Sequence, residues 1–124
     1  MRTMLYSKIH QARVTDVNLY YEGSITIARD IMEAADLLPY ERVEVLNINS
    51  GARLRTYVIE GKAGSGEICI NGPAARKAVK DDLVIILAYR SVPDEEARML
   101  TPKLVYLNSS DNTIVRIGLL KEER

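Results

Sequence analysis

The chain has 124 residues, which at about 150 residues per domain corresponds to one small domain. Hydrophobic residues make up 47% of it and charged residues 27%, a balance that excludes a disordered or collagen-like chain. Lys plus Arg and Asp plus Glu number 17 each and are spread evenly over both halves. This neutrality argues against a nucleic-acid platform and against a polybasic membrane anchor.

The scarce residue types narrow the chemistry further. Cys69 is the only cysteine and His10 the only histidine, which excludes an internal disulfide, a cysteine zinc site and a multi-histidine metal site. The longest apolar run, residues 83–89, is too short to cross a bilayer. Residues 1–10 lack the apolar core and cleavage site of a signal peptide, so we expect a cytoplasmic protein in a reducing environment.

Apolar periodicity and turn residues predict the elements of the first half of the chain. Ile31, Ala34, Ala35 and Leu38 follow a helical spacing that Pro39 ends. The expected elements are a long strand over 3–18, a turn and short strand over 20–27, a helix over 28–38, and a hairpin of strands 42–48 and 52–60.

The second half begins with a glycine-rich loop over 61–66. Pro73 suits the first turn of a helix because its missing N–H is not needed there. The expected elements are a buried strand over 68–70, a helix of about two turns over 74–79, an apolar strand over 83–88, a helical turn over 93–97, strands over 103–107 and 113–120, and a charged tail over 121–124. Many short strands with a few small helices favour a mainly β fold, a compact barrel with helical additions.

Searches for general catalytic motifs are unproductive. The chain has no phosphate-binding loop, dinucleotide fingerprint, zinc-protease motif or nucleophile elbow. Residues 64–66 are interpreted as a flexible hairpin tip, and the acidic clusters at 81–82 and 94–96 as solvated surface. Cys69, between two isoleucines, is interpreted as an inert buried thiol, and His10 as a strand histidine rather than a member of a triad.

An ordered set of short motifs carries the functional signal. The central one is Tyr21-Glu22-Gly23-Ser24, and the others lie at family spacing along nearly the whole chain. They are Met4-Leu5, Lys8-Ile9-His10, Val14-Thr15, Leu19, Thr56-Tyr57, Asn71-Gly72-Pro73-Ala74-Ala75, Asp82 to Ile86 and Pro93 to Arg98. In this set the chain resembles the pyruvoyl-dependent aspartate 1-decarboxylases. The resemblance implies a small double-psi β-barrel with two or three short helices, assembled as a homotetramer whose sites are shared between neighbouring copies.

The resemblance also implies a self-made cofactor. Ser24 would attack the Gly23 carbonyl, and the chain would cleave itself into residues 1–23 (the family's β chain) and 24–124 (its α chain), leaving a pyruvoyl group on the new N-terminus. That ketone would form a Schiff base with the substrate amine and accept the electrons released with carbon dioxide. Glycine at position 23 would allow unusual backbone angles and an unhindered attack. Whether cleavage requires a helper protein stays open at this point.

Further residues match the family's functional positions. Tyr57 matches the family's proton donor. A phenol suits this role because it keeps its proton at neutral pH and can deliver it to a carbanion-like carbon. Arg53 and Lys8 match positions that bind substrate carboxylates, with Arg53 expected to hold the retained side-chain carboxylate and Lys8 to support it. Thr56 would hydrogen-bond near the Gly23 carbonyl during cleavage and later near the substrate. The remaining substrate positions are Asn71, Gly72, Pro73 and Ala74. His10 falls on a position near the site and is assigned no step.

The expected activity is decarboxylation of L-aspartate to β-alanine, on the branch that feeds pantothenate and coenzyme A. Two alternatives stay open at this point. One is a double-psi barrel that keeps the fold, does not cleave, and serves as a binding module. The other is a pyruvoyl-dependent decarboxylase of a different amino acid. Neither nucleic acid, a membrane nor a metal is expected as a partner.

Overall fold

A computed structural model describes residues 1–20 and 22–119 of the chain. Within these residues, nine strands form one sheet in the order β2-β6-β3-β5-β4-β7-β1-β8-β9. The strands are β1 (Arg2–Arg13), β2 (Asp16–Asn18), β3 (Ser24–Ala28), β4 (Arg42–Asn47), β5 (Arg53–Gly61), β6 (Ile68–Asn71), β7 (Leu83–Val92), β8 (Lys103–Leu107) and β9 (Ile114–Leu119). The helices are α1 (Arg29–Ala34), α2 (Asp94–Met99) and the 3₁₀ helix η1 (Gly72–Lys77). The mainly β prediction with two or three short helices is confirmed.

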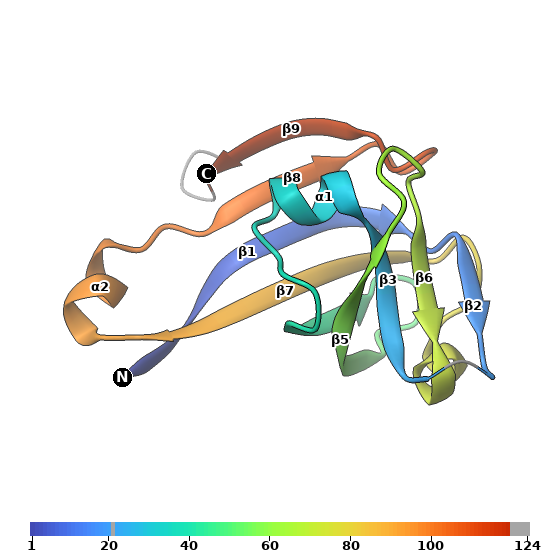
Figure 1. The fold of residues 1–124 in the computed structure, drawn as a ribbon, viewed down its shortest axis with the longest axis horizontal. Coiled ribbons are helices and arrows are strands. Elements are labelled where there is room, and N and C mark those ends of the chain that lie inside the picture. Colours follow the sequence, from blue (N-terminus) through green and yellow to red (C-terminus); the bar gives the residue numbers. More distant parts are fainter. Residues whose placement is uncertain (21, 120–124) are drawn as a thin grey trace.

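The sheet has two parts that cross each other. Figure 1 shows β1, β7, β8 and β9 running along the long axis of the molecule, with β3, β5 and β6 running steeply across them. Strand β5 belongs to both parts, since it pairs with β4 on one side and with β3 on the other. None of the helices in the described part of the chain is long and apolar enough to span a membrane.

Branched aliphatic side chains fill the space between the two parts. Ile25 and Ile27 from β3, Val58 from β5 and Ile68 and Ile70 from β6 are fully buried, and they share one cluster with aliphatic side chains of the long strands. β-Branched residues suit this packing because they have few rotamers to lose on a pleated surface. The double-psi crossing of the chain stays a prediction.

Most strands lie where the periodicity predicts them. The hairpin is confirmed, because β4 and β5 pair antiparallel around the turn after Asn47. Strands β6, β7 and β8 are also confirmed, and β9 pairs antiparallel with β8 as expected. The end of the last expected strand, the tail at 121–124 and Tyr21 lie outside the described residues.

The single long strand expected over 3–18 is wrong. Strand β1 ends at Arg13 and β2 starts at Asp16, and the two pair with different parts of the sheet. The break lies at Val14 and Thr15, whose backbone N–H groups donate to Asp82 and Ile68 at 2.9 and 2.8 Å instead of to a neighbouring strand in continuous register. The apolar alternation changes phase here, from Ala12 and Val14 to Val17 and Leu19, but no Gly or Pro marks the change of partner.

Both central helix predictions need correction. Helix α1 ends at Ala34 instead of 38, because Asp36 adopts a left-handed conformation (φ 58°) and Leu37 N–H donates to Met32 O at 2.8 Å, as in a Schellman motif. The second helix is a 3₁₀ helix over 72–77 instead of an α-helix over 74–79. Its first residue, Gly72, has a φ of 71° that other residues rarely adopt.

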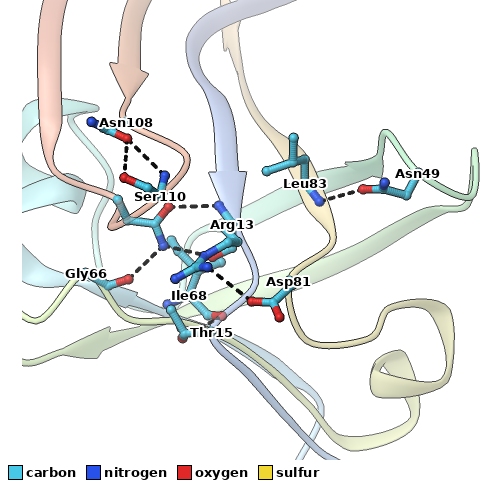
Figure 2. A network of polar contacts seen from close by, with 10 residues as sticks. Arg13, Thr15, Asn49, Gly66, Ile68, Asp81, Leu83, Asn108 and Ser110 are labelled. Carbon is cyan, nitrogen blue, oxygen red and sulfur yellow. Dashed lines mark hydrogen bonds and ion pairs between the residues drawn. The ribbon is translucent and has the colours of Figure 1, made fainter.

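A buried polar network anchors the start of β6, which carries one of the predicted site residues. Figure 2 shows Arg13 and Thr15, at and just beyond the end of β1, beside Ile68 and Gly66. Thr15 Oγ1 accepts from Ile68 N–H at 3.0 Å. Asn112, on the β8–β9 turn, accepts from Arg13 N–H and donates to the carbonyls of Arg13 and Gly66, each at 2.8 Å. One side chain therefore joins three separate segments of the chain.

We expect Asn112→Asp to destabilise the fold by about 2 kcal/mol or more, since a carboxylate cannot donate to two carbonyl groups and would be buried against them. Asn112 is 2% exposed, so water cannot replace the lost bonds. The measurement is the urea midpoint at fixed protein concentration. The control is Ser110→Ala on the exposed part of the same turn, expected within about 0.5 kcal/mol of the wild type. Equal midpoints for the two variants would contradict this role of Asn112.

Candidate functional site

Strand pairing places several predicted site residues side by side. Asn18 pairs with Asn71, and Asn71 pairs with Ser24. Ile25 pairs with Val58 in the parallel β3–β5 ladder, so the preceding residues Ser24 and Tyr57 are neighbours on adjacent strands. Since partners in register present their side chains on the same face, this polar row crosses the sheet on the side opposite the core. It consists of Asn18, Asn71, Ser24, Tyr57 and Arg42.

Ser24 is fully buried and its hydroxyl is fixed from two sides. Asn71 Nδ2 donates to Ser24 Oγ at 2.9 Å, and the Ser24 hydroxyl donates to the carbonyl of Glu22 at 3.2 Å. The same Asn71 amide donates to Thr26 Oγ1 at 3.0 Å. Its Oδ1 accepts from the Cys69 thiol, with 3.2 Å between sulfur and oxygen. Every polar atom of the Asn71 side chain is therefore used.

The backbone of Gly23 differs from the expectation. Its φ lies outside the left-handed region, and a Cβ built at this position would meet only Pro73 Cδ, at an ordinary 3.9 Å. Unusual backbone angles are therefore not the reason for a glycine here in the uncleaved chain. What remains is the space at the Cβ position of Gly23, where the ring of Pro73 is the nearest group.

A second group of predicted residues lines an open pocket of about 490 Å³ beside Pro73. Arg53 from β5 and Ala74 from η1 face each other across it, together with Lys77. The Arg53 guanidinium donates one N–H to Glu44 Oε1 at 3.0 Å, and within residues 1–20 and 22–119 its other N–H groups have no further side-chain partner. Arg53 and Lys77 make this pocket suitable for an anion, and it adjoins the Gly23–Ser24 bond through Pro73.

Two other predicted site residues, Lys8 and Thr56, do not line this pocket. Lys8 lies on β1, between Leu87 of β7 and Leu104 of β8, and faces away from its core neighbour Ile9. Thr56 faces the core side of β5, opposite to Tyr57, so its predicted contact with the Gly23 carbonyl stays a prediction.

His10 packs edge-on against Tyr106, with 5.2 Å between ring centroids. Burial and the nearby Lys8 charge lower its pKa. Tyr106 is therefore the packing partner of His10, which supports the interpretation of His10 as a packed strand histidine.

Sequence reasoning assigned no role to Thr26 and no hydrogen-bond partner to the thiol of Cys69. Both lie on the polar face of the sheet, since Thr26 pairs with Cys69 one step along from the Ser24–Asn71 pair. The burial of Cys69 is confirmed, and burial together with the carboxylates of Asp16 and Glu67 raises the pKa of its thiol. The alternation of Ser24 with Thr26 and of Cys69 with Asn71 would have indicated this face, but only after β3 and β6 were known to be neighbours.

Comparison with known proteins adds an independent finding. The family model described as aspartate decarboxylase matches residues 1–115. The chain belongs to the aspartate decarboxylase family. Curated relatives named aspartate 1-decarboxylase include one from Dehalococcoides mccartyi strain CBDB1, 56% identical over 120 residues that cover 96% of this chain and 97% of the relative. One from Thermoanaerobacter pseudethanolicus is 53% identical and covers 91% and 97%, and one from Staphylococcus aureus strain Newman is 50% identical and covers 98% and 95%.

The matched region of the aspartate decarboxylase family contains the complete polar row and the residues of the adjoining pocket. Residues 1–20 and 22–119 contain no group of three or more His, Cys, Asp or Glu side chains that could hold a metal ion.

Proposed function

We propose that the chain is a pyruvoyl-dependent decarboxylase that converts L-aspartate into β-alanine and carbon dioxide, the product serving the synthesis of pantothenate and coenzyme A. Family membership supports decarboxylation of aspartate. The observation that carries the mechanism is the register that makes Ser24, Asn71 and Tyr57 neighbours on one face. It joins a nucleophile, an amide donor and a phenol at one point of the sheet.

The first proposed reaction is cleavage of the chain itself. Ser24 Oγ attacks the carbonyl carbon of Gly23, the C–N bond breaks, and the hydroxyl proton passes to the nitrogen of Ser24, which gives an ester. Loss of the Cα proton of residue 24 then expels the Gly23 carboxylate and leaves a dehydroalanine at the new N-terminus. Its amine tautomerises to an imine, and water hydrolyses this imine to the ketone and releases ammonia. The contacts of Ser24 Oγ with Asn71 and Glu22 support this role, since they hold the nucleophile beside its target.

The surroundings of residue 24 fit a pyruvoyl group. A ketone only accepts hydrogen bonds, and Asn71 presents an N–H to this buried position. When formed, the group supplies an electrophilic ketone that takes up the electron pair released as carbon dioxide leaves. Burial of Ser24 also excludes bulk water, which would compete for a reactive carbon.

The chain's own residues have to bind the substrate and deliver a proton. Tyr57 lies beside Ser24, and we infer that its phenol gives its proton to the substrate α-carbon after carbon dioxide has left. Arg53 holds the retained side-chain carboxylate, because a clamp on the leaving carboxylate would stabilise the ground state and slow the reaction. Pro73 and Ala74 line the same pocket as Arg53.

Assembly into a homotetramer completes the proposal. Lys8 faces away from the core of its own chain, which supports its use at the site of a neighbouring copy. Strand β9 is an edge strand whose Val115 and Ile117 are exposed, a surface that favours contact with another chain.

The first prediction is that the purified wild-type chain appears as two fragments, 1–23 and 24–124, and that Ser24→Ala stays in one piece because it lacks the attacking oxygen. Intact-mass spectrometry and gel electrophoresis measure this. Ser65→Ala is the matched control for the second Gly-Ser pair, on an exposed loop, and should cleave normally. Cleavage at Ser65, or activity in the uncleaved Ser24→Ala chain, contradicts the proposal. A wild-type chain that stays whole indicates the non-catalytic alternative.

The second prediction concerns the proton donor. Tyr57→Phe removes one hydroxyl and little contact area, so folding and cleavage should persist. Turnover of aspartate should fall by about 10²- to 10⁴-fold, the usual contribution of a positioned acid. Borohydride in the presence of aspartate should still attach substrate to the larger fragment of this variant. Near-normal turnover would remove Tyr57 from the reaction.

The third prediction concerns carboxylate binding. Arg53→Ala should lower kcat/KM for aspartate by about 10- to 100-fold through loss of a charged partner, while leaving any activity on alanine, which has no side-chain carboxylate, unchanged. The kcat/KM of Arg53→Lys for aspartate should fall between those of the wild type and Arg53→Ala, because lysine keeps the charge and loses the planar guanidinium fork. Steady-state kinetics on both amino acids measure this. An equal loss on alanine would place Arg53 in the chemical step or in chain cleavage instead.

A further inference from the structure

Cys69 occupies a position from which it controls the amide next to Ser24. Its side chain lies on the polar face of β6, two residues before Asn71 and opposite Thr26 of β3. The thiol is 3.2 Å from Asn71 Oδ1, and the other end of the same amide is 2.9 Å from Ser24 Oγ and 3.0 Å from Thr26 Oγ1. The amide therefore lies between one sulfur and two hydroxyl oxygens.

The orientation of the Asn71 amide decides whether Ser24 Oγ accepts a hydrogen bond from it or donates one to it. A carboxamide has similar shape in its two orientations, and its terminal torsion is broad and roughly two-fold. With the nitrogen toward Ser24, the amide donates to Oγ and the Ser24 proton is directed to the Glu22 carbonyl. With the oxygen toward Ser24, the amide would instead accept the Ser24 proton and offer no donor to the oxygen that attacks.

The thiol favours the first orientation. A neutral thiol is a weak donor and a poor acceptor, so it is better matched to Oδ1 than to the N–H groups of the amide. Cys69 remains a neutral donor, because burial and the carboxylates of Asp16 and Glu67 raise its pKa. The hydroxyl oxygens of Ser24 and Thr26 are better acceptors for the amide N–H groups than the thiol sulfur is.

The geometry points to Cys69 as a positioning residue for chain cleavage: its thiol donates to Asn71 Oδ1 and thereby keeps the Asn71 N–H groups on Ser24 and Thr26. This inference rests on the proposed self-cleavage between Gly23 and Ser24. It adds a residue that touches neither the scissile bond nor the substrate and acts only through Asn71.

The test follows the rate of cleavage of the full chain made by cell-free synthesis, with intact mass as the readout. Cys69→Ala removes the donor and should slow cleavage about five- to tenfold, the effect of one lost hydrogen bond. Cys69→Ser keeps a donor on the same Cβ and should stay within about threefold of the wild type. Ile70→Val is the matched control, because it trims a fully buried side chain on the opposite face of β6 and should cleave at the wild-type rate.

A double-mutant cycle separates positioning from general stability. If Cys69 acts through Asn71, Cys69→Ala should change nothing further in an Asn71→Ala chain, where the amide is already absent. The inference would be overturned by cleavage of Cys69→Ala at the wild-type rate, or by an equal slowing in Ile70→Val. It would also be overturned if Cys69→Ser failed to restore the rate, or if the two substitutions were fully additive in the cycle. A wild-type chain that does not cleave would instead overturn the proposed function, so the two failures are distinguishable.

Discussion

The register of β3 between two neighbours of opposite direction is the constraint on which the candidate site depends. Strand β3 runs parallel to β5 and antiparallel to β6, so each of its residues has a defined partner on both sides. Because side chains alternate along a strand, a slip of one residue would move Ser24 into the core and Ile25 onto the polar face. The fully buried Ile25, Val58 and Ile70 oppose such a slip, since their burial would be lost. Apolar packing on one face thereby fixes polar geometry on the other.

Two buried asparagines hold the ends of the segment that carries Asn71. Asn112 ties the loop before β6 to the end of β1. Asn47 acts beyond β6, where its amide donates to the Lys77 carbonyl at the end of η1 and to the Asp82 carboxylate just before β7. Hydrogen bonds of buried side chains to backbone groups are costly to break, because water cannot replace them. The segment from β6 to η1, which supplies Asn71 to the polar row and Pro73 and Ala74 to the adjoining pocket, is therefore fixed at both ends.

Strand positions followed from local pattern, whereas strand partners did not. The alternation of Val43 and Val45 and the turn after Asn47 were sufficient for the β4–β5 hairpin, since its contacts are close in sequence. The break at Val14 depends on a backbone contact with the distant Asp82, and the left-handed Asp36 that shortens α1 is bound by the distant Arg90. The 3₁₀ helix η1 begins at Gly72, whose φ of 71° no apolar pattern indicates. The same limit applies to the site: resemblance to a family indicated Ser24, Asn71 and Tyr57 by position, but the roles of Thr26 and Cys69 required knowledge that β3 and β6 pair.

The central place of β1 has a consequence for a chain cut after residue 23. Strand β1 lies between β7 and β8 and joins β8 and β9 to the rest of the sheet, and β2 lies against β6. The small fragment would therefore supply one interior strand, β1, and one edge strand, β2, both held only by noncovalent bonds, as in a split protein whose halves complement each other. Before the cut, folding is a unimolecular process. After it, reassembly would need two molecules to meet, so the stability of the cut protein would depend on concentration and a single unfolding event would separate the halves.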